Sequence, residues 1–467
     1  MIKFGTDGWR GVIADDFTYE NLRFVALASA DYLKEISNNS DYPSAVIGYD
    51  GRFMSREFAE EASRVLASQG ITVHISDKIS STPQVSFNTR QKKAELGFVI
   101  TASHNPAKYN GFKVKSSFGG PATPSQIERL EEILHDKIDE GFDFNLKTFS
   151  EYEENGKIKQ FDAKESYIRH LKKKIDFDVI QKAYFKVIFD PMHGAGMGML
   201  SGLIEKVFEL HSDWNPGFGN VDHPEPIESC LPDLIGTIKK GDFDFGLATD
   251  GDADRLGAVD GEGNFVDSHK IFMILLRYLY ENKKKRGDVV KTVSLTSMVE
   301  MYCEDKGIKL HETPVGFKYT ADIMTQKDVL LGGEESGGLG TSLHIPERDG
   351  IFNGLLLLEA MAVTGKSLKQ LCDDLDEQFG PHRYHRIDKK MSEEKKNAIL
   401  EAANKLPEKI GRFEVERIDT KDGIKFYFHN AWLLIRASGT EPLLRFYAEA
   451  ESDTVVNELL HEAMNLA

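Results

Sequence analysis

Three aspartates at alternate positions, Asp250, Asp252 and Asp254, are the clearest sign of chemistry in the sequence. They directly follow an apolar run, residues 243–249, that predicts a buried strand. Carboxylates at positions i, i+2 and i+4 of a tight loop can converge on one hard cation, Mg²⁺ or Ca²⁺. A calcium EF-hand loop is excluded because its sixth position needs glycine and holds Arg255, and its twelfth needs glutamate and holds glycine. A solvated acidic turn is the alternative, but three like charges after an apolar strand favour a metal site. Arg255 beside that metal would suit a phosphoryl oxygen.

A serine beside a histidine follows a second predicted strand, residues 96–101. Residues 101–106 (TASHNP) place Ser103 next to His104 at the end of this strand. A serine with a neighbouring base can act as a nucleophile. An ordinary polar turn is the alternative, because serine, asparagine and proline are common turn residues.

A third loop, residues 333–337 (GEESG), has the composition of a hydroxyl-binding turn. Glu334 and Ser336 suit hydrogen bonds to vicinal sugar hydroxyls, although a plain turn is equally compatible with this composition. Arg10 and Lys318 lie in glycine-containing segments that we expect to be loops, where a solvated charge is the usual role.

A fourth loop, residues 436–442 (RASGTEP), could hold a phosphate dianion through side chains and exposed backbone N–H groups. The alternative is a strand-to-helix cap. The candidate ligands are Arg436, Ser438, Gly439 and Thr440. Together, the four loops indicate phosphoryl chemistry, which depends on positioning and charge neutralisation. A separate anion site implies a substrate held by a phosphate that is not reacting.

The elements that would position these loops alternate between strands and helices. A strand expected at residues 45–49 is followed by an amphipathic helix over residues 56–69, and a strand expected at residues 185–189 ends in a glycine-rich turn. This alternation favours α/β domains with largely parallel sheets, in which ligands bind in loops after the strands. Residues 144–160 are expected to be a linker. Residues 424–436 have the pattern of a hairpin in a final block.

The composition describes a soluble protein with ample core. Its 467 residues include 58 basic and 75 acidic side chains, and the formal charge of −17 argues against a nucleic-acid or anionic-membrane surface. Cys230, Cys303 and Cys372 are too few and too scattered for a disulfide framework or zinc knuckle, which favours a reducing compartment. The first residues lack the apolar core of a secretory signal, and the apolar run at 271–280 is too short to span a bilayer. We therefore expect a cytoplasmic protein.

The order and spacing of the four loops resemble the α-D-phosphohexomutases, of the phosphoglucomutase/phosphomannomutase type. The resemblance covers essentially the full length, from residues 4–8 (FGTDG) to the C-terminal block. It implies an α/β fold of four domains around a central cleft, three similar α/β units and a C-terminal α+β domain. The expected limits are 1–150 with the phosphoserine loop, 151–260 with the metal loop, 261–380 with the sugar loop, and 381–467 with the phosphate loop.

The resemblance also implies a mechanism. Ser103 would be carried as a phosphoserine, and one of its oxygens would bind Mg²⁺ together with Asp250, Asp252 and Asp254. The phosphoserine would convert a hexose 1-phosphate into a hexose 1,6-bisphosphate, which reorients, returns its other phosphate to Ser103 and serves as activator. The resemblance implies acid/base chemistry for His104 and for Lys113, which lies in residues 110–113 (NGFK). It implies sugar contacts for Glu334 and Ser336, and catalytic or cleft-lining positions for Arg10, Arg255 and Lys318. The residues implied to bind the distal phosphate are Arg436, Ser438, Gly439 and Thr440. The expected partners are sugar phosphates, with no nucleic acid or membrane, and the chain would be a monomer or homodimer.

Three departures from the family pattern bear on the substrate. Gly338 stands where many bacterial relatives have histidine, and residues 316–319 (GFKY) are similar to those of glucose-phosphate enzymes. Glu335 stands where the glucosamine-phosphate branch typically has glutamine. These residues favour glucose or mannose phosphate as substrate, and phosphoglucosamine mutase is the first alternative. A Mg²⁺-dependent sugar phosphatase and a non-catalytic sugar-phosphate-binding protein are the others.

Overall fold

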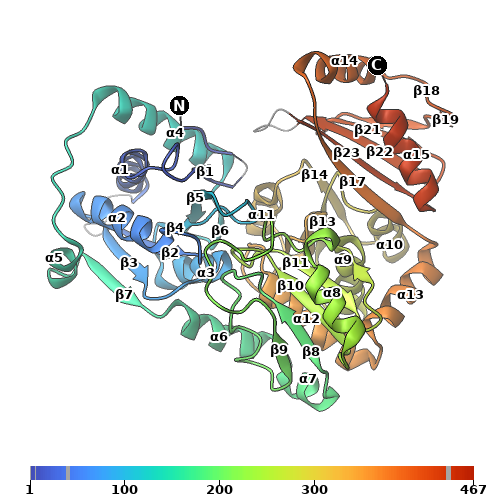
Figure 1. Cartoon of the computed structure of the whole chain (residues 1–467), viewed down its shortest axis with the longest axis horizontal. Coiled ribbons are helices and arrows are strands. Elements are labelled where there is room, and N and C mark those ends of the chain that lie inside the picture. Colours follow the sequence, from blue (N-terminus) through green and yellow to red (C-terminus); the bar gives the residue numbers. More distant parts are fainter. Residues whose placement is uncertain (1, 6, 38–42, 438–442, 467) are drawn as a thin grey trace.

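The computed structural model of the chain describes residues 2–5, 7–37, 43–437 and 443–466. Four main sheets follow one another along these described residues (Figure 1). The first, in blue, and the last, in red, lie at opposite ends of the molecule in this view, with the second and third between them. The expected class, three α/β domains followed by an α+β domain, is confirmed.

The first domain has a mixed sheet of order β1-β5-β4-β2-β3-β7, with β6 beside β5. Its central strands β2 and β4 are parallel and buried almost throughout, because helices cover both faces of the sheet. The strands are β1 (Trp9–Val12), β2 (Ser44–Tyr49), β3 (Thr72–Ser76), β4 (Leu96–Ile100), β5 (Tyr109–Ser116), β6 (Gly120–Pro121) and β7 (Ile158–Phe161). The helices are α1 (Tyr19–Ile36), α2 (Ser55–Ser68), α3 (Thr82–Lys92), α4 (Pro124–Glu140) and α5 (Phe149–Glu154).

The prediction that residues 144–160 form a linker is wrong for most of this range, because α5 and the start of β7 lie within it. β7 pairs in parallel with β3 and extends the first sheet past the domain limit expected at residue 150. The sequence does not show this strand because only Ile158 of its four residues is buried, so it has no period-two alternation.

The second and third domains also have parallel strands at their centres. The second sheet has the order β12-β11-β10-β8-β9 and the third β14-β13-β15-β16. The elements of the second domain are α6 (Ala163–Lys174), α7 (Phe177–Ala183), β8 (Val187–Asp190), β9 (Val207–Glu209), α8 (Pro232–Lys240), β10 (Phe245–Thr249), β11 (Leu256–Asp260) and β12 (Phe265–Val266). Those of the third are α9 (Ser268–Arg277), β13 (Asp288–Thr292), α10 (Met298–Lys306), β14 (Leu310–Thr313), α11 (Phe317–Gln326), β15 (Val329–Gly333), β16 (Leu339–Gly340), α12 (Gly350–Thr364) and α13 (Leu368–Phe379).

Helix α12 joins the second and third domains into one hydrophobic core. Its residues 350–361 are all buried, and its leucines belong to the same apolar cluster as β10 of the second domain and α9 of the third. In the described part of the chain no single helix is long and apolar enough to cross a membrane; α12 and α13 pass that test only together, with an 81° bend between them.

The fourth domain has an antiparallel sheet of order β17-β23-β22-β21-β20. The hairpin expected over residues 424–436 is confirmed, since Phe428 at the end of β21 pairs with Ala431 at the start of β22. The elements are β17 (Arg383–Lys390), α14 (Glu393–Asn404), β18 (Lys409–Ile410), β19 (Phe413–Glu414), β20 (Arg417–Asp419), β21 (Ile424–Phe428), β22 (Ala431–Ala437), β23 (Leu443–Ala450) and α15 (Asp453–Met464).

A buried lysine lies where the fourth domain packs on the third. Lys425 of β21 is 2% exposed, donates to the Val293 carbonyl at 2.6 Å, and lies 4.2 Å from the centre of the Trp432 ring. Burial, with the charge of Lys291 nearby, lowers the pKa of Lys425 to about 7 from an ordinary 10.5. The ammonium is therefore costly in the folded chain.

Lys425 makes stability depend on pH in a predictable direction. Between pH 7 and 10.5 the unfolded chain holds the Lys425 proton more tightly than the folded chain, so the free energy of unfolding rises with pH. Relative to Lys425→Met, we expect this rise to be up to about 1.4 kcal/mol per pH unit. Urea unfolding of both proteins at pH 7 and 9.5 measures it. Equal slopes in the two proteins would contradict the prediction.

Candidate active site

Ser103 lies directly after β4, at the edge of the first sheet that faces the second domain. Its hydroxyl donates to Asp250 Oδ2 at 2.9 Å and lies 3.3 Å from His104 Nδ1. The serine is 1% exposed, and its backbone is left-handed, with φ of 53°. The loops of the predicted nucleophile and the predicted metal site are therefore in direct contact. Gly251 permits this approach, because a Cβ there would lie 2.4 Å from the Ser103 carbonyl oxygen.

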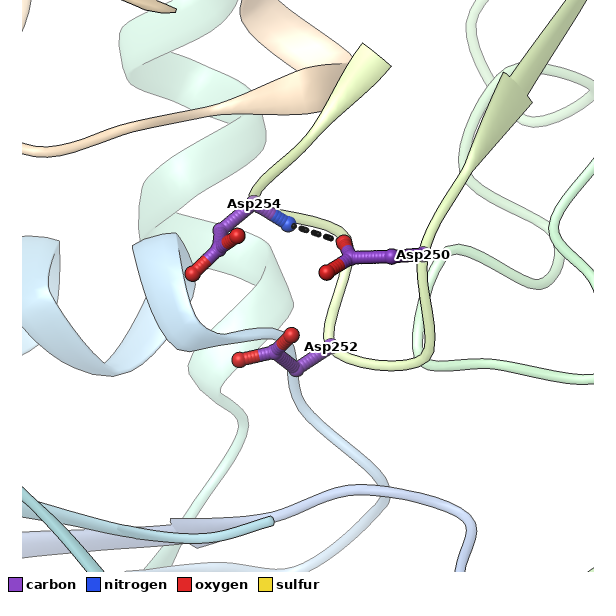
Figure 2. Close-up of side chains that lie close together, drawn as sticks. All are labelled: Asp250, Asp252 and Asp254. Carbon is purple, nitrogen blue, oxygen red and sulfur yellow. Dashed lines mark hydrogen bonds between the residues drawn. The ribbon is translucent and has the colours of Figure 1, made fainter. Parts of the chain in front are cut away.

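The three aspartates after β10 turn their carboxylates toward one point (Figure 2). All three are fully buried, and each offers an oxygen within 4.8 Å of the others. The loop is closed by the Asp254 N–H, which donates to Asp250 Oδ1 at 2.9 Å. Helix α3 adds Thr82, whose hydroxyl and N–H both donate to Asp252.

The electrostatics of this cluster fit a hard divalent cation. Burial, then the charges of Asp254 and Asp252, raises the pKa of Asp250 well above the ordinary aspartate value. Asp252 Oδ1 and Asp254 Oδ1 are buried and have no hydrogen-bond partner among the described residues. Buried carboxylate oxygens without partners are costly, and oxygen ligands are those that Mg²⁺ prefers.

Two buried cations from other domains neutralise the opposite side of the cluster. Lys113 Nζ of β5 lies 2.7 Å from Asp252, 3.0 Å from Asp254 and 2.8 Å from Asp7. Arg348, just before α12, lies 2.7 Å from Asp254 and 2.6 Å from Asp7. Although burial alone would lower it, the three carboxylates raise the pKa of Lys113. Lys113 is therefore protonated in this arrangement and acts as a fixed positive charge and not as a base.

His104 has the opposite character. Burial, followed by the charge of Arg255, holds the pKa of His104 well below its usual range. Its imidazole is therefore neutral at neutral pH. Because the Ser103 hydroxyl proton is donated to Asp250, Nδ1 is the ring nitrogen that can donate to Ser103 Oγ, and Nε2 is the one that can accept a proton.

Two of the predicted arginines, Arg255 and Arg10, have protein partners close to the serine and aspartate loops. Arg255 Nη1 donates to Glu225 at 2.9 Å, and its Nε lies 3.8 Å from Asp250. Arg10 Nη1 donates to Asn105 in the Ser103 loop at 2.6 Å. Arg10 lies in strand β1 and not in the loop expected from the sequence. Its side chain nevertheless reaches the predicted nucleophile loop.

The sugar loop after β15 lies at the third side of the site. Glu334 accepts from the Gly316 N–H at 2.9 Å and lies 3.3 Å from Arg348 Nη1. Burial, partly offset by Arg348, raises the pKa of Glu334. Ser336 is half-buried in the same turn. Lys318 lies in the first turn of α11 and not in a loop, and its Nζ is 5.4 Å from the Tyr319 ring centre.

The phosphate loop of the fourth domain is described only at its start. Arg436 at the end of β22 pairs with Asp422 at 2.9 Å, and Asp422 also accepts from the Val315 N–H beside the sugar loop. Ser438, Gly439 and Thr440 lie outside the described residues.

Four residues of the site escape the sequence reasoning. Asp7, Thr82, Glu225 and Arg348 are single polar residues whose partners are far along the chain. Among these four residues only Arg348 has a signal in the sequence: it is a charged residue just before a long apolar segment.

Comparison with known families identifies the chain. Residues 1–140, 165–263 and 267–379 match the phosphoglucomutase/phosphomannomutase alpha/beta/alpha domains I, II and III, and residues 387–466 match the C-terminal domain. The chain belongs to this phosphohexomutase family. It is therefore a mutase, and the resemblance drawn from its loops is confirmed.

Relatives of this mutase extend over its full length. A phosphoglucomutase/phosphomannomutase of Thermococcus kodakarensis is 31% identical, with 99% of this chain and 98% of the relative covered. A phosphoglucosamine mutase of Methanococcus vannielii is also 31% identical, with 100% and 98% covered. A crystal structure of a Thermus thermophilus protein assigned as a phosphomannomutase superposes with a TM-score of 0.87 at 34% identity, covering 100% of this chain and 98% of that one.

Lys113 should also stabilise the metal-free mutase. The Lys113→Met variant leaves Asp7, Asp252 and Asp254 without this buried cation, and breaking a buried pair on one side costs about 3–5 kcal/mol. We expect this loss in urea unfolding without metal, and a smaller one with Mg²⁺. The control is Lys34→Met, which removes an exposed pair with Asp31 and should cost at most about 1 kcal/mol. Similar small losses in both variants would contradict the role given to Lys113.

Proposed function

We propose that this mutase interconverts the 1-phosphate and 6-phosphate of glucose, and of mannose, through a phosphoserine at Ser103 and a hexose 1,6-bisphosphate intermediate. The observation that carries the proposal is the position of the Ser103 hydroxyl, 2.9 Å from Asp250 and 3.3 Å from a neutral His104. It joins a nucleophile, a candidate metal site and a proton carrier within one buried site.

In the first half-reaction the bond between phosphorus and Ser103 Oγ breaks, and a bond to the free sugar hydroxyl forms. The proton of that hydroxyl ends on Oγ, and neutral His104 is placed to carry it. The second half-reaction reverses these steps at the other phosphate of the bisphosphate. Lys113 and Arg348, both positively charged, supply fixed charge beside the reacting group.

The aspartates and the Ser103 phosphate would hold the divalent cation. When bound there, Mg²⁺ would reduce the negative charge on the phosphoryl oxygens and make the serine oxygen a better leaving group. The buried, unpartnered oxygens of Asp252 and Asp254 support this assignment. A hexose 1,6-bisphosphate is the proposed activator, since it can phosphorylate Ser103 directly.

Glucosamine phosphate is the second candidate substrate. A relative with the same identity to this chain as the phosphoglucomutase/phosphomannomutase, and nearly the same coverage, is named a phosphoglucosamine mutase. Glu335 favours a neutral sugar on the family pattern, and its side chain accepts from Ser294 at 2.5 Å.

A coupled assay with Mg²⁺ and a trace of glucose 1,6-bisphosphate separates these candidates. It compares glucose 1-phosphate, mannose 1-phosphate and glucosamine 1-phosphate at equal concentration. Higher kcat/KM for the glucose or mannose substrate supports the proposal. Turnover of glucosamine 1-phosphate alone would replace it with the second candidate.

A further inference from the structure

Arg52 is a buried arginine next to the site that the mechanism above does not use. Its side chain is fully buried, and all five of its donors are engaged. One goes to Asp50 at 3.1 Å, and four go to backbone carbonyls of the loop that carries Ser103. The four acceptors are the carbonyl oxygens of Ser103 (2.6 Å), Asn105 (2.7 Å), Pro106 (3.0 Å) and Tyr109 (3.1 Å).

The same Asp50 and Arg52 pair fixes both backbone groups of Ser103. Arg52 holds the carbonyl directly. The Ser103 N–H donates to Thr101 Oγ1 at 2.9 Å, and the Thr101 hydroxyl donates in turn to Asp50 at 2.6 Å. A left-handed serine costs free energy and persists only where its surroundings impose it. Here the imposing groups are Asp50, Thr101 and Arg52.

The second domain holds this arginine from the other side. The guanidinium carbon of Arg52 lies 4.8 Å from the centre of the buried Phe218 ring. Trp214 of the same loop donates from its indole nitrogen to the Gly51 carbonyl at 2.9 Å. Phe218 and Trp214 therefore connect the domain of the aspartate loop to the turn that carries Arg52.

We propose that Arg52 is a positioning residue that sets the Ser103 hydroxyl in its reactive orientation, and that Phe218 of the second domain fixes Arg52 in turn. The inference rests on the proposed phosphoserine mechanism. Since its donors are all engaged with protein groups, Arg52 acts through the loop and not on the sugar phosphate.

Arg52→Lys tests this role because it keeps the positive charge and removes the five-donor fork. A lysine cannot reach four carbonyls from one nitrogen. We expect kcat to fall about 100-fold, the size of effect that a 1 Å misplacement of a reacting group produces. KM for the hexose 1-phosphate should stay within about three-fold, because uniform binding is unchanged.

Phe218→Leu is the second variant, in case Arg52→Lys does not fold. It keeps an apolar side chain beside the guanidinium but removes the aromatic face, and we expect kcat to fall about three- to ten-fold. The control is Arg56→Lys on helix α2, whose exposed side chain pairs with Glu60; its kcat should match the unmodified enzyme.

The decisive measurement is the rate at which glucose 1,6-bisphosphate phosphorylates Ser103 in a single turnover, per folded enzyme. Slower phosphorylation in Arg52→Lys and Phe218→Leu, at unchanged KM, is the expected result. Phosphorylation at the unmodified rate in both variants would overturn the role of Arg52 and leave the proposed function intact. Failure of the unmodified enzyme to become phosphorylated would overturn the proposed function and this inference with it.

Discussion

Ser103→Ala is expected to lower kcat for hexose phosphate isomerisation by at least about 10⁴-fold, the scale seen when a nucleophile is removed. The substitution deletes the oxygen that lies 2.9 Å from Asp250. Asp250 cannot move into its place as phosphoryl carrier, because the N–H groups of Asp254 and Arg255 hold its carboxylate. The coupled assay with glucose 1-phosphate measures the loss.

Two controls accompany this variant. Ser229→Ala changes an exposed serine of the second domain and should leave kcat unchanged. Thermal unfolding of Ser103→Ala shows whether the left-handed backbone at this position still forms. A folded Ser103→Ala enzyme that keeps a tenth of the turnover would exclude Ser103 as the phosphoryl carrier.

Asp250→Asn is expected to lower kcat by at least about 10³-fold, in line with the loss of preorganised charge at a phosphoryl-transfer site. The amide oxygen can still accept from the backbone N–H groups of Asp254 and Arg255. The amide nitrogen, however, replaces the oxygen that accepts from Ser103 and would bind the cation.

Compared with the unmodified enzyme, the same variant should be more stable without metal and should gain no stability from added Mg²⁺. Burial and the neighbouring carboxylates raise the pKa of Asp250, so removing its charge relieves repulsion in the metal-free enzyme and raises the melting temperature. Added Mg²⁺ should raise the melting temperature of the unmodified enzyme but not of Asp250→Asn. Asp242→Asn, at an exposed position, is the matched control. An equal response to Mg²⁺ in all three proteins would place the cation elsewhere.

Much of this site could be predicted because its chemistry is concentrated in loops directly after strands. The strands β4, β10 and β15 are short, apolar and followed by loops rich in polar or charged residues, so the positions of Ser103, Asp250 and Glu334 are visible in the sequence. Parallel strands place such loops at the carboxyl edge of each sheet. The contact between Ser103 of the first sheet and Asp250 of the second depends in addition on how the two domains pack.

The rest could not be predicted because it depends on contacts between domains. Arg348 and Asp7 are 341 residues apart and meet at 2.6 Å, and no local pattern marks either as a partner of the aspartate loop. Arg52 shows the same limit. Its four carbonyl acceptors carry no side-chain signal, and its aromatic neighbour Phe218 comes from another domain.

Strand β7 shows a different limit. A four-residue edge strand with one buried side chain has no periodicity to detect, so the sequence predicts a linker there.

The most direct test of the phosphoserine mechanism is to follow labelled phosphate from glucose 1,6-bisphosphate into the enzyme with Mg²⁺ present. The mechanism predicts label on the peptide that contains Ser103, and its transfer to sugar when unlabelled glucose 1-phosphate is added. Label that is absent from Ser103, or that leaves only as inorganic phosphate when the sugar is added, would contradict it.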